Sequence, residues 1–212
     1  DLDDREHLLG QRDVVLGQAV QRLADSGTDT SLELFSRIDS ADRTERIGGN
    51  RGRALLKSLP NAGADAVTGP MCAPNIFRSS FSNWQPGYAM GEVMAKKGHK
   101  KVVTITWKYA AGDESVKGFK EAFEKGGGSV VKELSLPFPG VEFQALLTEI
   151  AAAKPDAVYT FFAGGGAVKF VKDYDAAGLK GKVPLFGPGF LTDGTLEAQG
   201  ASAQGLQTTL HY

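Results

Sequence analysis

The amino-acid sequence predicts an α/β fold in which a doubly wound parallel sheet is covered by helices on both faces. Two observations carry this prediction. From residue 101 onward, short β-branched or aromatic runs alternate strictly with longer segments whose apolar residues recur at helical spacing. The strand-like runs are apolar at consecutive positions, which is typical of strands buried on both faces of a parallel sheet.

Each predicted element has its own local signal. Strands are predicted over residues 102–107, 130–136, 157–162, 183–186 and 206–210, and helices over residues 112–125, 143–151, 168–177 and 194–199. Three consecutive glycines end the first of these helices, and Pro155 follows the second. An earlier helix is predicted through residues 88–94, with Ser82 or Asn83 as its N-cap and Pro86 in its first turn.

The first part of the chain gives weaker signals, which predict a helix, a strand and a weak helix over residues 8–24, 32–38 and 47–56. Two glycines interrupt the last of these, and each costs about 1 kcal/mol relative to alanine. One strand cannot bury the face of a sheet. We therefore expect an incomplete lobe over residues 1–80, a complete lobe over residues 81–212, and no independent sheet from residues 1–59.

Composition excludes several classes of protein. The 212 residues are 42% hydrophobic and 23% charged, with a formal net charge of −1, which gives no reason to expect nucleic acid or an anionic membrane as a partner. No apolar run is long enough to cross a bilayer. No basic and apolar leader begins the sequence, so we expect any secretion signal to have been removed or to lie outside it. The single cysteine, Cys72, is expected to act as a small apolar residue in a loop or the core.

Motifs for catalysis or cofactor binding are scarce. The three histidines are far apart in the sequence, and no spacing of His, Cys, Asp or Glu resembles a metal site. Neither a P-loop nor a Gly-x-Ser-x-Gly elbow is present. Residues 164–166 are glycines that follow a strand and open a helix, but the spacing of a dinucleotide fingerprint fails after them. A tight turn is favoured over a phosphate site there, and no cofactor, metal or enzyme activity is expected.

Aromatic residues collect where the predicted strands end. Ligands of open α/β sheets bind beyond the carboxyl ends of the strands. Those ends carry the runs Trp-Lys-Tyr-Ala at residues 107–110, Phe-Phe-Ala-Gly at residues 161–164 and Gly-Pro-Gly-Phe at residues 187–190. One aromatic residue in such a place is more often core than ligand contact, but three loops at one edge favour a pocket that stacks rings and offers backbone N–H groups.

Several segments together resemble the type I periplasmic binding proteins of the branched-chain amino acid (Leu/Ile/Val-binding) class. Residues 60–65, 75–80 and 82–86 are similar to the region between the two lobes of that family, and residues 107–115, 142–147 and 186–194 continue the match in order. The resemblance covers residues 60–212. More weakly, residues 16–20 and 32–37 resemble the first helix and second strand of the family's first lobe.

The resemblance has gaps that bear on the first lobe. The family's first strand has no counterpart before Asp1, and the strands and helices that normally lie between Leu55 and Pro60 are missing. The sequence ends at Tyr212, where the family crosses back into the first lobe. The chain therefore resembles a complete second lobe joined to a shortened or rearranged first lobe.

By this resemblance the protein is the solute-binding subunit of an ABC transporter, located in the periplasm or otherwise outside the cytoplasm, with a membrane permease as its partner. The resemblance implies that the lobes close about a hinge at residues 79–83. It also assigns ligand contacts on both sides of the cleft. Backbone donors come from the first lobe, at Asn61 and Gly63. The second lobe lines the cleft with Tyr109, Phe162, Ala163 and Gly189. Trp84 and Phe190 are two further aromatic candidates.

The ligand class follows from a missing charge. Amino-acid binders of the family usually hold the α-ammonium group with an acidic side chain in the loop after the fourth strand of this lobe. Here that loop has no charge at residues 187–190, and Asp193 is the nearest substitute. An unpaired ammonium group in a dry cleft costs several kcal/mol. An aromatic or other organic acid is therefore favoured over leucine or valine.

Two alternatives remain open at this stage. The first is a scaffold for folding or dimerisation, in which the first lobe is too depleted for solute binding and exposed apolar edges bring two copies together. The second is a flavodoxin-like or Rossmann enzyme, which the missing nucleotide fingerprint disfavours.

Overall fold

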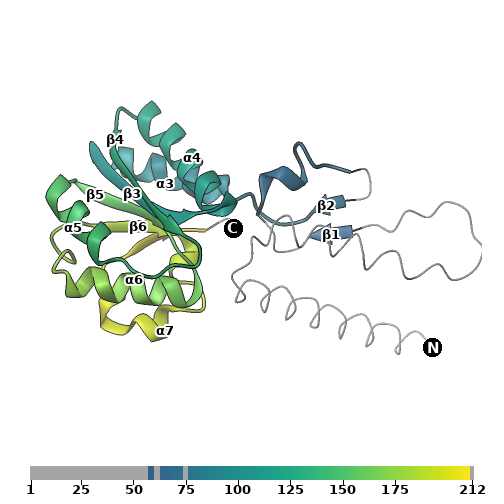
Figure 1. Cartoon of the computed structure of the whole chain (residues 1–212). Helices are drawn as coiled ribbons and strands as arrows, with labels where there is room; N and C mark the ends of the chain where they lie inside the picture. The colour runs from purple at the N-terminus through teal and green to yellow at the C-terminus, as the bar shows by residue number, and fades with distance from the viewer. Residues whose placement is uncertain (1–56, 60–62, 74–75, 211–212) are drawn as a thin grey trace, which may run out of the picture. The chain divides into compact units, whose positions relative to one another are not determined.

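The computed structural model describes residues 57–59, 63–73 and 76–210 (Figure 1), and the predicted elements at residues 8–24, 32–38 and 47–56 lie outside them. Every described residue belongs to one compact unit, Arg53–Tyr212. None of the described helices is long and apolar enough to span a membrane. The boundary that we place between residues 80 and 81 stays a prediction.

Five parallel strands form the main sheet, in the order β4-β3-β5-β6-β7. They are β3 (Lys101–Lys108), β4 (Ser129–Pro137), β5 (Ala157–Phe161), β6 (Leu185–Pro188) and β7 (Gln207–Thr209). Upstream, β1 (Lys57–Leu59) and β2 (Ile76–Arg78) pair in parallel as a two-stranded sheet, with the 3₁₀ turn η1 (Asp65–Val67) between them in the chain. The parallel, doubly wound sheet is as predicted.

Helices cover both faces of the main sheet (Figure 1). On one face lie α3 (Trp84–Lys96) and α4 (Ala110–Lys125), and on the other lie α5 (Gln144–Ala153) and α6 (Gly164–Ala176). The turn η2 (Gly189–Leu191), the short helix α7 (Leu196–Gln199) and the turn η3 (Gly200–Ala203) connect β6 to β7. We call residues 84–209 the lobe.

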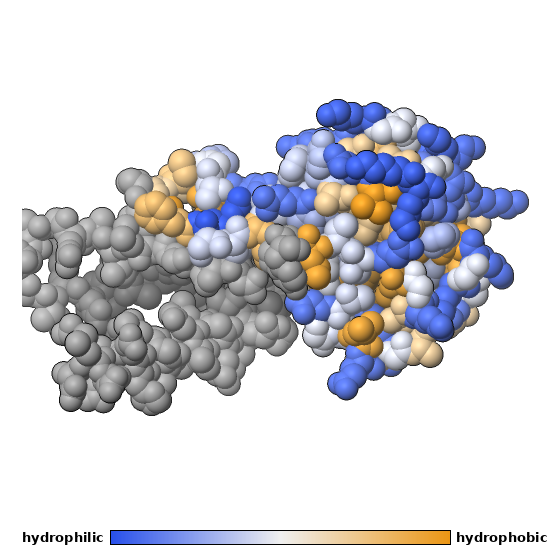
Figure 2. All heavy atoms as spheres, turned by 180° about the vertical axis from the view of Figure 1, so that it is seen from behind, coloured by the Kyte–Doolittle hydropathy of each residue, from blue (hydrophilic) through white to orange (hydrophobic). Residues whose placement is uncertain are grey.

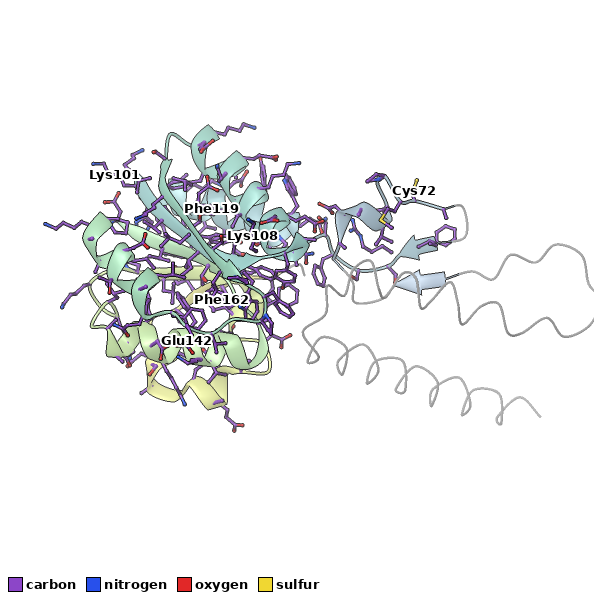
Figure 3. All side chains as sticks on the ribbon, in the orientation of Figure 1. Cys72, Lys101, Lys108, Phe119, Glu142 and Phe162 are labelled. Carbon is purple, nitrogen blue, oxygen red and sulfur yellow. The ribbon has the colours of Figure 1, made fainter. Side chains whose placement is uncertain are left out.

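Alternation along the strands divides the core into two clusters. Val103, Ile105 and Trp107 of β3 pack toward α5 and α6, whereas Val102 packs toward α3 and α4. Figure 3 shows Phe119 and Phe162 on opposite sides of the sheet, one in each cluster. Because both faces are covered, all six residues between the ends of β3 are buried. In the view from behind, hydrophilic side chains cover most of the lobe and apolar ones show as scattered spots (Figure 2).

The two helices α3 and α4 approach each other closely because glycines lie at their contact. A Cβ atom at Gly91 would lie 2.4 Å from the backbone oxygen of Phe119, and one at Gly118 would lie 2.3 Å from the backbone oxygen of Trp84. Backbone atoms cannot turn aside as a side chain can. The close spacing of these helices therefore requires glycine, which has no side chain, at both positions.

We expect Gly91→Val to lower the free energy of unfolding by at least about 1–3 kcal/mol, because the added side chain forces α3 away from α4. Urea unfolding followed by circular dichroism measures the loss. Glu92→Val is the matched control, since it adds the same residue at an exposed position of the same helix. Equal losses in the two variants would show that helix propensity, and not packing, is responsible.

Differences from the predicted elements are confined to their ends. The helix predicted from residue 168 begins at Gly164, so the three glycines form its first turn and not a preceding loop. Of the two predicted N-caps of α3, Ser82 does the capping: its hydroxyl accepts from the N–H of Trp84 at 3.1 Å, and its own N–H donates to the Gln85 side chain at 2.9 Å. This leaves the amide of Asn83 available for other partners.

Candidate functional site

The strand order places the topological switch point of the sheet, where open α/β sheets form their binding crevice, at the carboxyl ends of β3 and β5. From β3 the chain moves outward to β4, and then returns past β3 to β5 on its other side. The helices that follow these neighbouring strands, α4 and α6, therefore start side by side on opposite faces of the sheet. Open α/β sheets bind ligands at such a switch point.

A row of aromatic rings follows this edge in the order of the strands. Phe138 follows β4, Tyr109 follows β3, Phe161 ends β5 and Phe190 follows β6. Consecutive ring centroids lie 5.0 Å, 6.0 Å and 5.8 Å apart along this series. Phe81 extends it, with its ring 5.2 Å from that of Phe190. We call these five residues the aromatic row.

Members of the aromatic row differ in exposure. Tyr109, Phe138 and Phe190 are half-buried, whereas Phe161 is 3% exposed and Phe81 is 6% exposed. Burial raises the pKa of the Tyr109 hydroxyl, so this group stays neutral and can donate a hydrogen bond at physiological pH. The row presents ring faces and edges with one neutral hydroxyl and no charge.

One predicted site residue needs correction by a single position. Phe162 is fully buried, and its ring contacts Trp107, Phe143 and Phe170 inside the core between the sheet and the helices α5 and α6. Side chains alternate along a strand, so the preceding residue, Phe161, points to the other face and joins the aromatic row. The sequence shows two adjacent phenylalanines and does not say which of them faces the crevice.

The other candidates of the lobe differ in their surroundings. Ala163 is half-buried immediately before α6, and Gly189 is buried beside Leu210 at the end of β6. Trp84 is half-buried, stacks on Tyr88 at 4.5 Å and donates from its indole N–H to Glu121 at 2.9 Å. These contacts attach Trp84 to α3 and α4.

The candidates expected from the first lobe are described only in part. Asn61 lies outside the described residues. Gly63 is half-buried, and its backbone oxygen accepts from the backbone N–H of Asn83 at 2.9 Å. A Cβ atom at Gly63 would lie 2.3 Å from the side-chain oxygen of Asn83, so a larger residue would require that side chain to move.

Backbone N–H groups face the same crevice from two helices. Neither α4 nor α6 has a side-chain hydrogen bond at its N-cap, where Tyr109 and Ala163 stand. Gly164 and Gly165 are exposed in the first turn of α6, and a Cβ atom at either would meet nothing within 4 Å. Free N–H groups at a helix N-terminus carry partial positive charge and suit a carboxylate.

Acidic groups do not replace the missing charge in the described loop after β6. Asp193 is exposed, and its backbone N–H donates to the oxygen of Gly189 at 2.8 Å. The four residues that precede this turn, 187–190, carry no charge. The crevice therefore offers donors and rings to a ligand and no carboxylate at residues 187–190.

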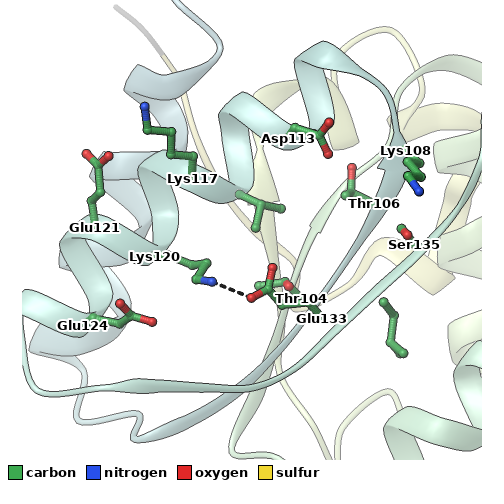
Figure 4. Close-up of a pocket in the computed structure, with 12 residues that line it drawn as sticks. Thr104, Thr106, Lys108, Asp113, Lys117, Lys120, Glu121, Glu124, Glu133 and Ser135 are labelled. Carbon is green, nitrogen blue, oxygen red and sulfur yellow. Dashed lines mark hydrogen bonds and ion pairs between the residues drawn. The ribbon is translucent and has the colours of Figure 1, made fainter.

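A groove lies elsewhere in the lobe, between α4 and the strands β3 and β4 (Figure 4). It has a volume of about 480 Å³, and the charged residues that line it are of both signs: Lys108, Lys117 and Lys120, with Asp113, Glu121, Glu124 and Glu133. Glu133 already pairs with Lys120 across it. Size alone does not make this the site, because the groove is open and has no aromatic lining, although it reaches Lys108 at the end of β3.

Among the described residues, no cluster of His, Cys, Asp or Glu could hold a metal ion. Cys72 is exposed in a loop and forms no disulfide, so of the two predicted places for it the structure selects the loop. The described part of the chain holds no arrangement of side chains that points to a nucleophile with its base.

A parallel doubly wound sheet with aromatic rings at its switch point is typical of lobes that bind small molecules. Comparison with protein families gives it a name: the model of the periplasmic binding protein family matches residues 15–212. The chain belongs to this family, as its resemblance implied. A relative named Leu/Ile/Val-binding protein homolog 6, from Brucella melitensis, is 34% identical over 143 residues, which are 66% of this chain and 37% of the relative.

Solved structures similar to this chain are solute-binding proteins of ABC transporters. One from R. palustris, in complex with benzoate, is 59% identical, with a TM-score of 0.70 over 73% of this chain and 42% of that one. Another, from Rhodopseudomonas palustris BisB5 with 3,4-dihydroxybenzoic acid, is 34% identical, with a TM-score of 0.69 over 74% of this chain and 43% of that one. The chain thus spans less than half the length of these relatives.

Proposed function

We propose that this chain contributes the second lobe of a solute-binding subunit of an ABC transporter, and that its ligand is an aromatic carboxylic acid of the benzoate type. The observation that carries the proposal is the aromatic row beside two uncapped helix N-termini at the switch point. The protein acts outside the cytoplasm and hands its ligand to a membrane permease. Its role is binding and not catalysis.

A benzoate-type ligand matches both halves of the crevice. Its carboxylate suits the free N–H groups before α4 and α6, where each favourable charge interaction with a helix terminus is worth about 0.3–1 kcal/mol. Its ring suits the aromatic row, because each offset or edge-to-face ring pair adds about 0.5–1.5 kcal/mol. Tyr109 keeps its proton and can donate to a ligand oxygen.

An amino acid suits the crevice less well. Its α-ammonium group needs a carboxylate partner once water is excluded, and an unpaired buried charge costs several kcal/mol. The loop at residues 187–190 has none, and Asp193 is exposed in the next turn. The aromatic acids in the related solved structures support this choice, while the Leu/Ile/Val name of the Brucella relatives favours the rival ligand.

Ligand contacts of this chain are proposed at Tyr109, Ala163, Gly189 and Phe190, with Phe161 in the place first given to Phe162. Asn61 and Gly63 are proposed as first-lobe donors, and Trp84 as a contact at the rim of the crevice. Closure of two lobes over the ligand would then require a first lobe around residues 1–80.

Titration calorimetry with benzoate and with leucine tests the proposal. We expect benzoate to bind and leucine to bind at least about tenfold more weakly, which corresponds to about 1.4 kcal/mol. Thermal unfolding gives a second measure, since benzoate at a hundredfold excess over Kd stabilises the folded protein by about 2.7 kcal/mol.

Light scattering, measured together with the titration, distinguishes solute binding from the alternative function as a scaffold for dimerisation. A stable dimer that binds neither compound would favour a scaffold for dimerisation, for which the exposed Phe77 and Leu196 are apolar contacts. Tight leucine binding without a response to benzoate would overturn the proposed ligand class and keep the solute-binding role.

A further inference from the structure

One carboxylate of the lobe holds two neighbouring segments of the chain. Glu114 lies in α4 and is half-buried. One of its oxygens accepts from the backbone N–H of Asp65 at 3.0 Å, and the other accepts from the side-chain amide of Asn83 at 3.0 Å. The two donors are 18 residues apart in the sequence, so a single side chain ties both segments to the helix.

The two segments are also bonded to each other. The backbone N–H of Asn83 donates to the oxygen of Gly63 at 2.9 Å. The guanidinium group of Arg78 donates to the backbone oxygens of Gly63 and Ala64 at 3.3 Å and 3.0 Å, and it pairs with the Asp65 carboxylate at 3.3 Å. Glu114 thus closes a network that includes residues 63–65, Arg78 and Asn83.

This network surrounds one end of the aromatic row. Phe81 lies between Arg78 and Asn83 in the sequence, and its ring lies 5.2 Å from that of Phe190. Because Ser82 caps α3, the side chain of Asn83 is free to bond Glu114. Phe81 is therefore held close to α4, because Asn83, two residues further along the chain, is bonded to Glu114 of that helix.

We propose that Glu114 is a positioning residue, whose carboxylate fixes residues 63–65 and 78–83 on α4 and so holds Phe81 against Phe190 at the end of the aromatic row. Glu114 acts through Asn83. The inference rests on the proposed function in one respect, which is that the aromatic row binds the ligand.

Charge state gives the network a distinctive response to pH. Burial raises the pKa of Glu114, although the bonds from Asn83 and from the Asp65 N–H, and the charge of Arg78, act in the opposite direction and the charge of Asp65 adds to the rise. A protonated Glu114 keeps one acceptor oxygen, and its hydroxyl finds an acceptor only if the Asn83 amide turns its oxygen toward it. A raised folded-state pKa makes stability fall as pH rises from the unfolded-state pKa through the folded-state pKa.

Glu114→Ala tests the inference in the full chain, with Glu124→Gln as the control for loss of an exposed carboxylate on the same helix. In the alanine variant we expect the nuclear Overhauser contact between the Phe81 and Phe190 rings to disappear, exchange of the Asp65 amide proton to quicken about tenfold, and benzoate affinity to fall about tenfold. The control should keep the ring contact, and its affinity should change less than about twofold.

Glu114→Gln separates positioning from simple loss of fold. Its carbonyl oxygen still accepts from Asp65, and its NH₂ group can donate to the Asn83 oxygen once that amide is turned. We expect the ring contact and benzoate affinity to return.

The outcomes distinguish this inference from the proposed function. A Phe81–Phe190 contact that persists in Glu114→Ala would overturn the positioning role whether or not benzoate binds. An affinity that is unchanged after the ring contact is lost would overturn it too. If the unmodified protein binds no benzoate, the proposed function fails, and loss of the ring contact in Glu114→Ala still supports the positioning of Phe81.

Discussion

Phe162→Ala is expected to lower the free energy of unfolding by about 3–5 kcal/mol, because it removes a fully buried ring from a core that cannot collapse around the space. The ring has three aromatic neighbours, at 4.7–5.1 Å, which lose part of their packing at the same time. Urea unfolding followed by circular dichroism measures this change, which is among the largest expected from a single substitution in the lobe.

Phe190→Ala is the matched control, since the same substitution is made at a half-buried ring. We expect it to cost about 1 kcal/mol, the usual size for a side chain outside the core. Similar losses for the two variants would mean that Phe162 is not a core residue, and would reopen its assignment to the crevice.

The sequence was sufficient for the fold of the lobe because local and global signals agree there. Strands buried on both faces, helices with one apolar stripe and glycine or proline at the ends all indicate the same parallel α/β architecture. The first helical turn of α6 was missed because three glycines have low helix propensity. Packing explains why a glycine occurs in this helical turn, because a Cβ atom at Gly166 would lie 2.3 Å from the Trp107 ring.

The crevice was predictable in place but not in every residue. Residues after consecutive parallel strands must meet at one edge, which located Tyr109 and Phe190. Strands buried on both faces have no polar and apolar alternation, so the sequence could not choose between Phe161 and Phe162. Phe81 and Phe138 come from connecting segments, and their contact with the row depends on tertiary structure.

Glu114 had a signal that sequence reasoning could have used. It lies four residues before Gly118, so both face the same side of α4, and Gly118 is one of the positions where α3 comes close. A carboxylate on the stripe that faces another helix is an unusual residue and requires a partner. What the sequence could not supply is that the partners, Asp65 and Asn83, come from segments 49 and 31 residues away.

Removing a ring from the aromatic row should affect binding far more than stability. We expect Phe190→Ala to weaken benzoate binding at least about tenfold, because the ligand ring loses both buried apolar area and a ring contact. Phe190→Leu should lose only about threefold to fivefold, since leucine restores apolar area without the ring. Titration calorimetry at fixed pH and salt measures all three proteins.

Leu196→Ala completes the design, because Leu196 is a 57% exposed apolar residue of α7 that belongs to no part of the aromatic row. Its benzoate affinity should match that of the unmodified protein. The decisive comparison is between Phe190→Ala and Phe190→Leu. Equal losses would assign the effect to the ring, whereas full recovery in Phe190→Leu would assign it to apolar area and deny any role to the ring. An unchanged affinity in Phe190→Ala would remove the aromatic row from the binding site, and the ligand would then have to contact the helix N-termini of α4 and α6 without it.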